Sequence, residues 1–240
     1  MKEKIYTIPV NEAFDSHSEC PFCYLREKME RDVVDFVMGP SYMDEDIRAI
    51  TDKMGFCDDH FVKMYNSGNK LGLALILSTH LKKINKDLSQ IFDSELNEKR
   101  KGFFEKKHQS SPYCQFNASL QGTCYACEKI SERMESYYNT FFYLFKTEPE
   151  FCEKIRVGKG FCLDHLGQVI KKGKKALSPK IYEQLLQVVI PLQKENLERL
   201  DKELEWFIQK FDYRFQEEPW KDSKDAPERG ILKVSGAKVK

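Results

Sequence analysis

The sequence lacks any long hydrophobic run. Its most apolar stretch, Leu71 to Leu77, is far shorter than the roughly 20 residues needed to cross a bilayer. The first residues, Met1 to Phe14, contain scattered apolar side chains but not the continuous apolar segment of a secretory signal. We therefore expect a cytoplasmic protein that is not inserted in a membrane.

The chain also lacks an excess of charge of either sign, with 39 Lys and Arg residues against 38 Asp and Glu residues. Proteins whose surface is built for nucleic acid or anionic membrane are strongly basic, so neither is an expected partner. A protein partner is compatible with this balance, and monomer and dimer both stay open. We interpret two basic clusters as solvated helix ends or loops: Lys99-Arg100-Lys101 with Lys106-Lys107, and Lys171-Lys172 with Lys174-Lys175. The first encloses Phe103 and Phe104, an arrangement also found in proteins that bind single-stranded nucleic acid.

Signals for β-strands are nearly absent, and so are the common catalytic loops. The sequence contains no phosphate-binding loop, nucleophile elbow or dinucleotide fingerprint. Apolar residues instead recur three or four positions apart, as helices require: Leu77, Leu81, Ile84, Leu88 and Ile91 are one example. These patterns predict an all-α fold.

What the sequence does contain is eight cysteines, six of which belong to a duplicated pattern. A CxxC dyad precedes a CxxH dyad by 33 residues in the first copy and by 34 in the second. Three thiols and one imidazole complete a tetrahedral zinc shell. We therefore predict two zinc ions with the following ligands: Cys20, Cys23, Cys57 and His60 from the first copy, and Cys124, Cys127, Cys162 and His165 from the second.

Spacing alone leaves the pairing of the dyads open. Pairing within a repeat closes the shorter loops and has the lower entropic cost, but Cys20 and Cys23 could instead share a metal with Cys162 and His165. The same donors could also hold an iron–sulfur centre, or act as a redox-responsive switch in which a CxxC closes to a disulfide. A metal-dependent enzyme is a further alternative. Catalytic zinc needs an open coordination position, however, and four ligands per site favour a non-enzymatic binding or regulatory module.

The duplication also defines the expected domains: an extended segment 1–19, a first repeat 20–96, a connector 97–123, a second repeat 124–215 and an irregular tail 216–240. In each repeat we expect a helix beginning at the CxxC, a short helix, a glycine turn into the CxxH helix, and a long amphipathic helix. Each metal would thus connect two helix starts. Pro191 should kink or divide the last long helix.

Three further residues receive structural interpretations. Cys114 and Cys152 have no counterpart in the first repeat, so we interpret them as packed or incidental thiols, although Cys114 could approach the second metal. His80 lies on the apolar side of a predicted helix and is expected to be a core histidine with a satisfied hydrogen bond.

Several motifs together resemble a bacterial family catalogued only as a domain of unknown function. They are CPFC…GFCDDH, CYAC…GFCLDHL, the tail FDYRF…EPWKDSKDAPERGI and the N-terminal IPVNEAF. The resemblance covers nearly the whole chain and implies a cytosolic helical protein with no established activity. Some similar proteins carry a transporter substrate-binding label, but this sequence has neither the export signal nor the α/β pattern of such proteins.

Overall fold

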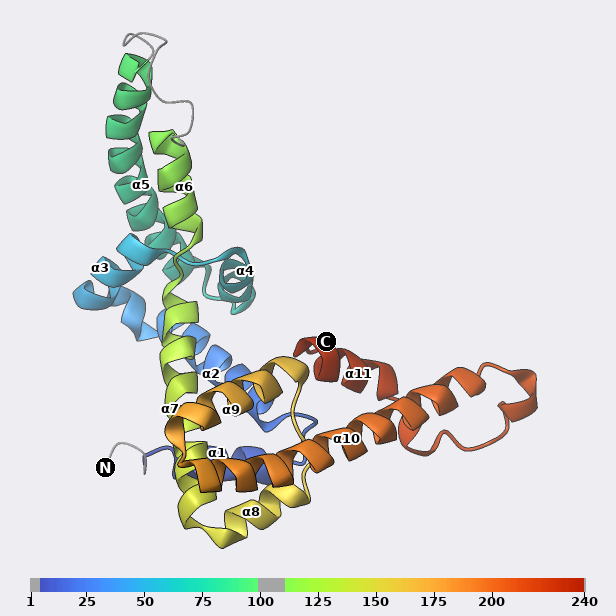
Figure 1. Ribbon diagram of the computed structural model, residues 1–240. Helices are drawn as coiled ribbons and strands as arrows, with labels where there is room; N and C mark the ends of the chain where they lie inside the picture. The colour runs from blue at the N-terminus through green and yellow to red at the C-terminus, as the bar shows by residue number, and fades with distance from the viewer. Residues whose placement is uncertain (1–4, 99–110, 240) are drawn as a thin grey trace. The chain divides into compact units, whose positions relative to one another are not determined.

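The computed structural model describes residues 5–98 and 111–239. Every regular element within these ranges is a helix, which confirms the all-α fold class (Figure 1). Contacts divide the chain into two compact units: unit 1 combines the chain up to Lys28 with the chain from Arg133 onward, and unit 2 is Met29–Glu132. The two boundaries fall inside helices α2 (Pro21–Met38) and α7 (Tyr125–Thr147). In the described ranges, no helix combines the length and the apolarity that crossing a membrane requires.

Unit 1 is organised around the long helix α10. The remaining helices of the unit are the start of α2, the end of α7, and four others, of which α8, α9 and α11 pack directly on α10. Two short 3-10 turns, η3 and η4, separate α10 from α11. The bounds are α1 Thr7–Asp15, α8 Pro149–Arg156, α9 Leu163–Ala176, α10 Pro179–Gln209, η3 Tyr213–Phe215, η4 Lys221–Ser223 and α11 Ala226–Ser235.

Five phenylalanines form the centre of unit 1. The ring of Phe14, on α1, lies with its centroid 4.9 to 6.3 Å from those of the other four. All five side chains are buried, and burying one such ring contributes about 1.5–3 kcal/mol. The other four rings come from α2, α7, α8 and the loop before α9, so one aromatic core joins segments from both ends of the sequence: Phe22, Phe141, Phe151 and Phe161.

Unit 2 is built around α5 (Lys70–Glu98), which packs against α3 (Glu45–Met54) and lies beside α6 (Pro112–Gln121) in Figure 1. Asp44 caps α3, because its carboxylate accepts hydrogen bonds from the backbone N–H groups of Asp46 and Ile47. The unit also contains the end of α2, the 3-10 turn η2 (Pro40–Met43), α4 (Asp58–Asn66) and the first residues of α7.

The four helices expected in each repeat occur in the same order, α2 to α5 and α7 to α10. A glycine with positive φ precedes each CxxH helix: 64° at Gly55 and 75° at Gly160. The cysteine two residues after the glycine, Cys57 or Cys162, has an extended conformation and forms the N-cap of α4 or α9. The same backbone geometry therefore presents both CxxH dyads.

Two segments that were predicted to be non-helical contain helices. The N-terminal segment, expected to be extended, contains α1, which buries Val10, Ala13 and Phe14 at helical spacing. The tail, expected to be irregular, contains α11, with Pro227 in its first turn and left-handed Gly236 directly after it. Both expectations were wrong because short helices stabilised by tertiary packing give weak sequence signals.

Two further expectations concern the connector and Pro191. The connector 97–123 contains α6, while the first basic cluster, Phe103 and Phe104 lie outside the described residues. Pro191 lies inside α10 and does not divide it.

Candidate metal centres

The eight predicted ligands form two clusters, and each cluster draws on both repeats. Cluster A lies in unit 1 and consists of Cys20, Cys23, Cys162 and His165. Cluster B lies in unit 2 and consists of Cys57, His60, Cys124 and Cys127. In each cluster the four ligand atoms all lie within 4.8 Å of one another. The within-repeat pairing favoured by loop entropy is therefore wrong, and the cross-repeat pairing is the one observed.

The entropic preference for within-repeat pairing is smaller than the free energy gained from the core packing that accompanies cross-repeat pairing. Connecting Cys23 to Cys162, 139 positions away, instead of to Cys57, 34 positions away, costs about 1.2 kcal/mol of additional loop closure. In unit 1, Phe22 of the CxxC stacks on Phe161 with 5.8 Å between the ring centroids. Burial of one such ring outweighs the loop penalty. Core packing thus determines which dyads meet.

Unit 2 shows the corresponding contacts. The ring of Phe56, directly before Cys57, lies 6.1 Å from that of Tyr125, which stands inside the second CxxC. The Tyr125 backbone N–H also donates to the Gly55 carbonyl at 3.0 Å, and the Thr123 hydroxyl donates to the Met54 carbonyl at 2.7 Å. The chain entering α7 is therefore fixed to the turn that enters α4.

The distances in cluster A match those around one tetrahedral ion. Zinc–sulfur and zinc–nitrogen bonds of about 2.3 and 2.0 Å imply separations of about 3.8 Å between sulfurs and about 3.5 Å from sulfur to nitrogen. The Sγ atoms of Cys20, Cys23 and Cys162 lie 3.3, 3.3 and 3.2 Å from His165 Nδ1, and Cys23 Sγ lies 3.6 Å from Cys162 Sγ. All four residues are buried.

Cluster B has the same arrangement but is more exposed. His60 Nδ1 lies 3.1, 3.4 and 3.5 Å from the Sγ atoms of Cys57, Cys124 and Cys127. Cys57 Sγ and Cys127 Sγ are 3.8 Å apart. Cys124 and His60 are buried, whereas Cys57 is half-buried and Cys127 is exposed. Both clusters thus provide three sulfurs and an Nδ1 nitrogen, a donor set that suits zinc.

Protons are distributed unequally within each cluster. In cluster A, hydrogen bonding with Cys20 and Cys23 lowers the pKa of Cys162, and burial lowers the pKa of His165 less than the neighbouring thiols raise it, to about 9. In cluster B, burial raises the pKa of Cys124, but hydrogen bonds from His60 and from the Cys127 backbone N–H bring it down to about 6. Each cluster therefore stabilises one thiolate, the form of cysteine that binds metal, whereas a metal bound to cluster A would have to displace a proton from His165.

A comparison with known proteins gives the family. The model of one protein family, described only as a family of unknown function (DUF6062), matches residues 1–240. The chain belongs to DUF6062. A curated relative, the uncharacterized 23.9 kDa protein in the xynA 3' region of Caldicellulosiruptor sp. (strain Rt8B.4), is 26% identical over 195 residues, covering 81% of this chain and 83% of its own. No solved structure matches. The resemblance noted from the sequence is thereby confirmed.

In this DUF6062 protein, the C-terminal helix covers cluster A. The Cys23 thiol points at the Gly236 carbonyl oxygen, 3.9 Å away, and the Arg26 guanidinium donates to the same oxygen at 2.7 Å. A Cβ on Gly236 would lie 3.5 Å from Cys162 Sγ, so the backbone of this residue approaches the cluster closely. The places of Arg26 and Gly236 beside cluster A were not predicted from the sequence. Pro227 and Gly236 could have indicated α11, because proline favours the first turn of a helix and glycine the position after its end.

A buried charge network anchors this cover. Lys233, on α11, is 0% exposed, and its ammonium donates to the carbonyls of Glu19 and Lys159 at 2.8 and 2.5 Å. The Glu19 carboxylate lies 3.2 Å from Lys233 and accepts hydrogen bonds from Arg199 at 2.8 and 2.7 Å. Since three thiolates around a zinc ion would carry a net charge of −1, a buried cation beside Cys20 also suits a loaded site.

Cluster B has a carboxylate next to its histidine. Glu30 Oε1 lies 3.4 Å from His60 Nε2 and 2.6 Å from Lys63 Nζ. Glu30 and His60 do not form a hydrogen bond, and His60 Nε2, which is buried, has no hydrogen-bond partner among the described residues. With Nδ1 directed at the sulfurs, Glu30 is placed to orient the ring from its other side.

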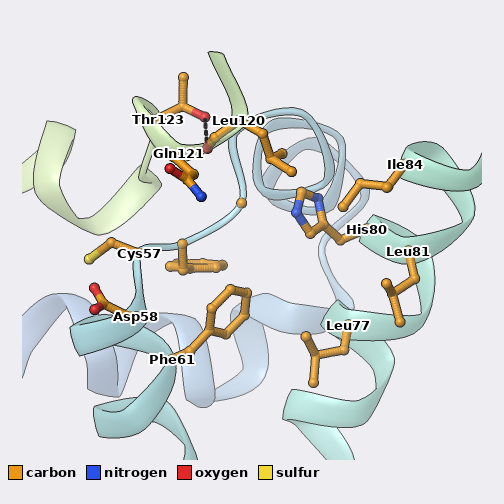
Figure 2. A pocket seen from close by; sticks show the side chains of 12 residues that line it. Cys57, Asp58, Phe61, Leu77, His80, Leu81, Ile84, Leu120, Gln121 and Thr123 are labelled. Atoms are coloured by element: carbon orange, nitrogen blue, oxygen red, sulfur yellow. Dashed lines mark hydrogen bonds between the residues drawn. The ribbon is translucent and has the colours of Figure 1, made fainter. Parts of the chain in front are cut away.

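A cavity of about 630 Å³ adjoins cluster B (Figure 2). Its lining is mostly apolar and includes Phe61, Leu77 and Leu120, while Cys57 and Asp58 form the end nearest the cluster. His80 extends into this space from α5 and donates from Nδ1 to the Asp52 carbonyl oxygen at 2.8 Å. The expectation of a buried, satisfied histidine is thus confirmed, and the cavity is a feature that the sequence did not reveal.

The two remaining cysteines lie outside both clusters. Cys114 is exposed on α6, and Cys152 is half-buried on α8, where its thiol donates to the Phe145 carbonyl at 3.4 Å. Neither one joins a group of potential metal ligands in the described part of the chain. The alternative in which Cys114 approaches the second metal is therefore wrong.

Proposed function

We propose that the protein binds one zinc ion in each cluster and that the two ions are structural elements of a non-enzymatic binding or regulatory module. The observation that carries this proposal is the pair of four-ligand sets, each with three Sγ atoms and one Nδ1 at the separations of a single tetrahedral shell. Four protein ligands form a closed site, which stabilises a fold but offers no open position for a substrate. Each ion would connect chain segments that are far apart in sequence.

The compactness of the clusters favours a single ion over an iron–sulfur centre. All ligand atoms of a cluster lie within 4.8 Å of one another, a spread that one ion can span. In an iron–sulfur cluster the same ligands would be distributed over separate irons. We further propose a cytoplasmic location and a protein partner, which are supported by the eight free cysteines and by the net charge of +1.

Zinc analysis of paired variants tests both the metal and the pairing. The unsubstituted protein, purified without added metal, should contain two zinc ions per chain. Cys20→Ser with Cys162→Ser removes two ligands from the same cluster, so one zinc ion should remain. Cys20→Ser with Cys57→Ser removes one ligand from each cluster and should weaken both sites. Within-repeat pairing predicts the opposite pattern.

A matched control is available in the two cysteines outside the clusters. Cys114→Ser with Cys152→Ser should leave the zinc content at two per chain. Iron in place of zinc, with visible absorption, would contradict the proposal, and so would a protein that folds fully and contains no metal.

A further inference from the structure

The two clusters differ mainly in how far they are open to solvent. In cluster A every ligand is buried, with Cys20 and Cys162 at 0% exposure. In cluster B, Cys127 is exposed and Cys57 is half-buried. The same set of donors therefore exists once in a sealed environment and once in an open one.

Distances between the sulfurs do not distinguish the clusters. Cys57 Sγ and Cys127 Sγ are 3.8 Å apart in cluster B, and Cys23 Sγ and Cys162 Sγ are 3.6 Å apart in cluster A. Both pairs are close enough that one sulfur could attack the other after oxidation. Any difference in reactivity must then come from access.

Small molecules can reach cluster B from the solvent, because Cys127 is exposed and Cys57 is half-buried. In cluster A, the backbone at Gly236 lies against Cys23 and Cys162, and the Arg26 guanidinium holds this segment in place. With metal bound, all three cysteines of a cluster are thiolates, so their susceptibility to oxidants differs through exposure.

We propose that cluster B is an oxidation site for hydroperoxides, and that a disulfide between Cys57 and Cys127 forms there with release of the metal. This inference rests on the proposed binding of zinc. The Cys127 sulfur attacks one oxygen of hydrogen peroxide and the O–O bond breaks, so that Cys127 becomes a sulfenic acid and the other oxygen takes a proton from the solvent and leaves as water. The Cys57 sulfur then displaces the hydroxyl oxygen, which leaves as a second water after protonation.

The electrons balance in this sequence. The two thiolates lose two electrons in total as the S–S bond forms, and hydrogen peroxide gains both as it is reduced to two waters. The zinc ion loses two of its four protein ligands and dissociates. Cluster A keeps its metal, so unit 1 stays intact while unit 2 loses its metal crosslink.

The test uses the full chain carrying Cys114→Ser and Cys152→Ser, which leaves only the six cluster thiols. Zinc content is measured first. The protein is then treated with hydrogen peroxide, released zinc is followed with a chromogenic chelator, and samples are blocked with N-ethylmaleimide for peptide mapping. We expect one zinc ion to be released at least tenfold faster than the other, together with a peptide pair joined through Cys57 and Cys127.

The outcomes separate this inference from the proposed function. A protein with fewer than two zinc ions before treatment overturns the proposed function. Two zinc ions released at equal rates overturn the oxidation site while leaving zinc binding intact. A first disulfide that contains Cys23 or Cys162, or one that omits Cys57 or Cys127, also overturns it.

Discussion

Replacing Lys233 by methionine tests how the C-terminal helix is held over cluster A. The Lys233 ammonium is fully buried and contacts three acceptors: the carbonyls of Glu19 and Lys159 at 2.8 and 2.5 Å, and the Glu19 carboxylate at 3.2 Å. Methionine retains an apolar side chain of similar length but no donor. The substitution therefore isolates the contribution of the charged group.

The expected loss can be estimated from these contacts. A buried group left without its hydrogen-bond partner costs about 1–3 kcal/mol, and removing one member of a buried ion pair costs about 3–5 kcal/mol. Arg199 still donates to both oxygens of the Glu19 carboxylate at 2.8 and 2.7 Å, so this carboxylate keeps a partner. Removing the ammonium also removes its own desolvation cost. We expect Lys233→Met to lower the free energy of unfolding of unit 1 by about 3 kcal/mol.

Tryptophan fluorescence during urea unfolding of the zinc-loaded protein measures this change. Both tryptophans of the chain, Trp206 and Trp220, belong to unit 1 and therefore report on that unit. Lys238→Met is the matched control, because Lys238 forms an exposed ion pair with Glu27 at 2.9 Å and should change stability by less than about 1 kcal/mol. A Lys233→Met protein that loses less than about 1 kcal/mol, or becomes more stable, would refute the reasoning.

Three further outcomes are expected. Gly160→Ala should lower the free energy of unfolding by about 2 kcal/mol, because φ is 75° and the new Cβ would lie 2.7 Å from the Gln193 side-chain oxygen. Gly167→Ala is the control: this glycine lies in α9 with open space around it, so the substitution should raise the free energy of unfolding by about 0.5–1 kcal/mol in the same urea titration. Burial raises the pKa of Glu19, but Lys233 and Arg199 lower it by more, so the folded-state pKa lies below that of an ordinary glutamate. The contribution of Glu19 to stability is therefore complete above the unfolded-state pKa of about 4.3 and is lost as the pH falls through the folded-state pKa. Acid titration of unit 1 should show this loss, with a smaller slope in Lys233→Met. Glu30→Gln should weaken zinc binding at cluster B about tenfold in a chelator competition and leave cluster A unchanged; equal weakening at both would contradict the contact with His60.

The helices of each repeat could be predicted from the sequence because residues close together in the chain determine where they begin and end. The apolar spacing along α5, the proline at the start of α8 and the glycines before Cys57 and Cys162 are short-range signals, and the structure contains the corresponding elements. The metal ligands could be predicted for the same reason, since CxxC and CxxH each place two donor side chains within one helical turn.

Which CxxC dyad pairs with which CxxH dyad could not be predicted from their spacing in the sequence. Loop entropy separates the two pairings by only about 1 kcal/mol, and the contacts that decide between them join residues remote in sequence. Phe22 with Phe161, and Phe56 with Tyr125, meet only in the folded chain. Lys233 illustrates the same limit, because a lysine in a polar tail gives no sign that it will be fully buried.

The cross-repeat pairing also imposes an order on biosynthesis. The ligands of cluster B, 57 to 127, lie in the sequence between the two halves of cluster A, 20–23 and 162–165. His60 and Cys124 are 64 positions apart, an interval of about 3–13 s at 5–20 residues per second of translation. Throughout this interval the growing chain displays Cys20, Cys23, Cys57 and His60, a complete but non-native ligand set. If the clusters bind metal as proposed, an ion captured at that stage would have to exchange two of these ligands before either final site is complete, and the timing of metal delivery relative to translation would then affect folding.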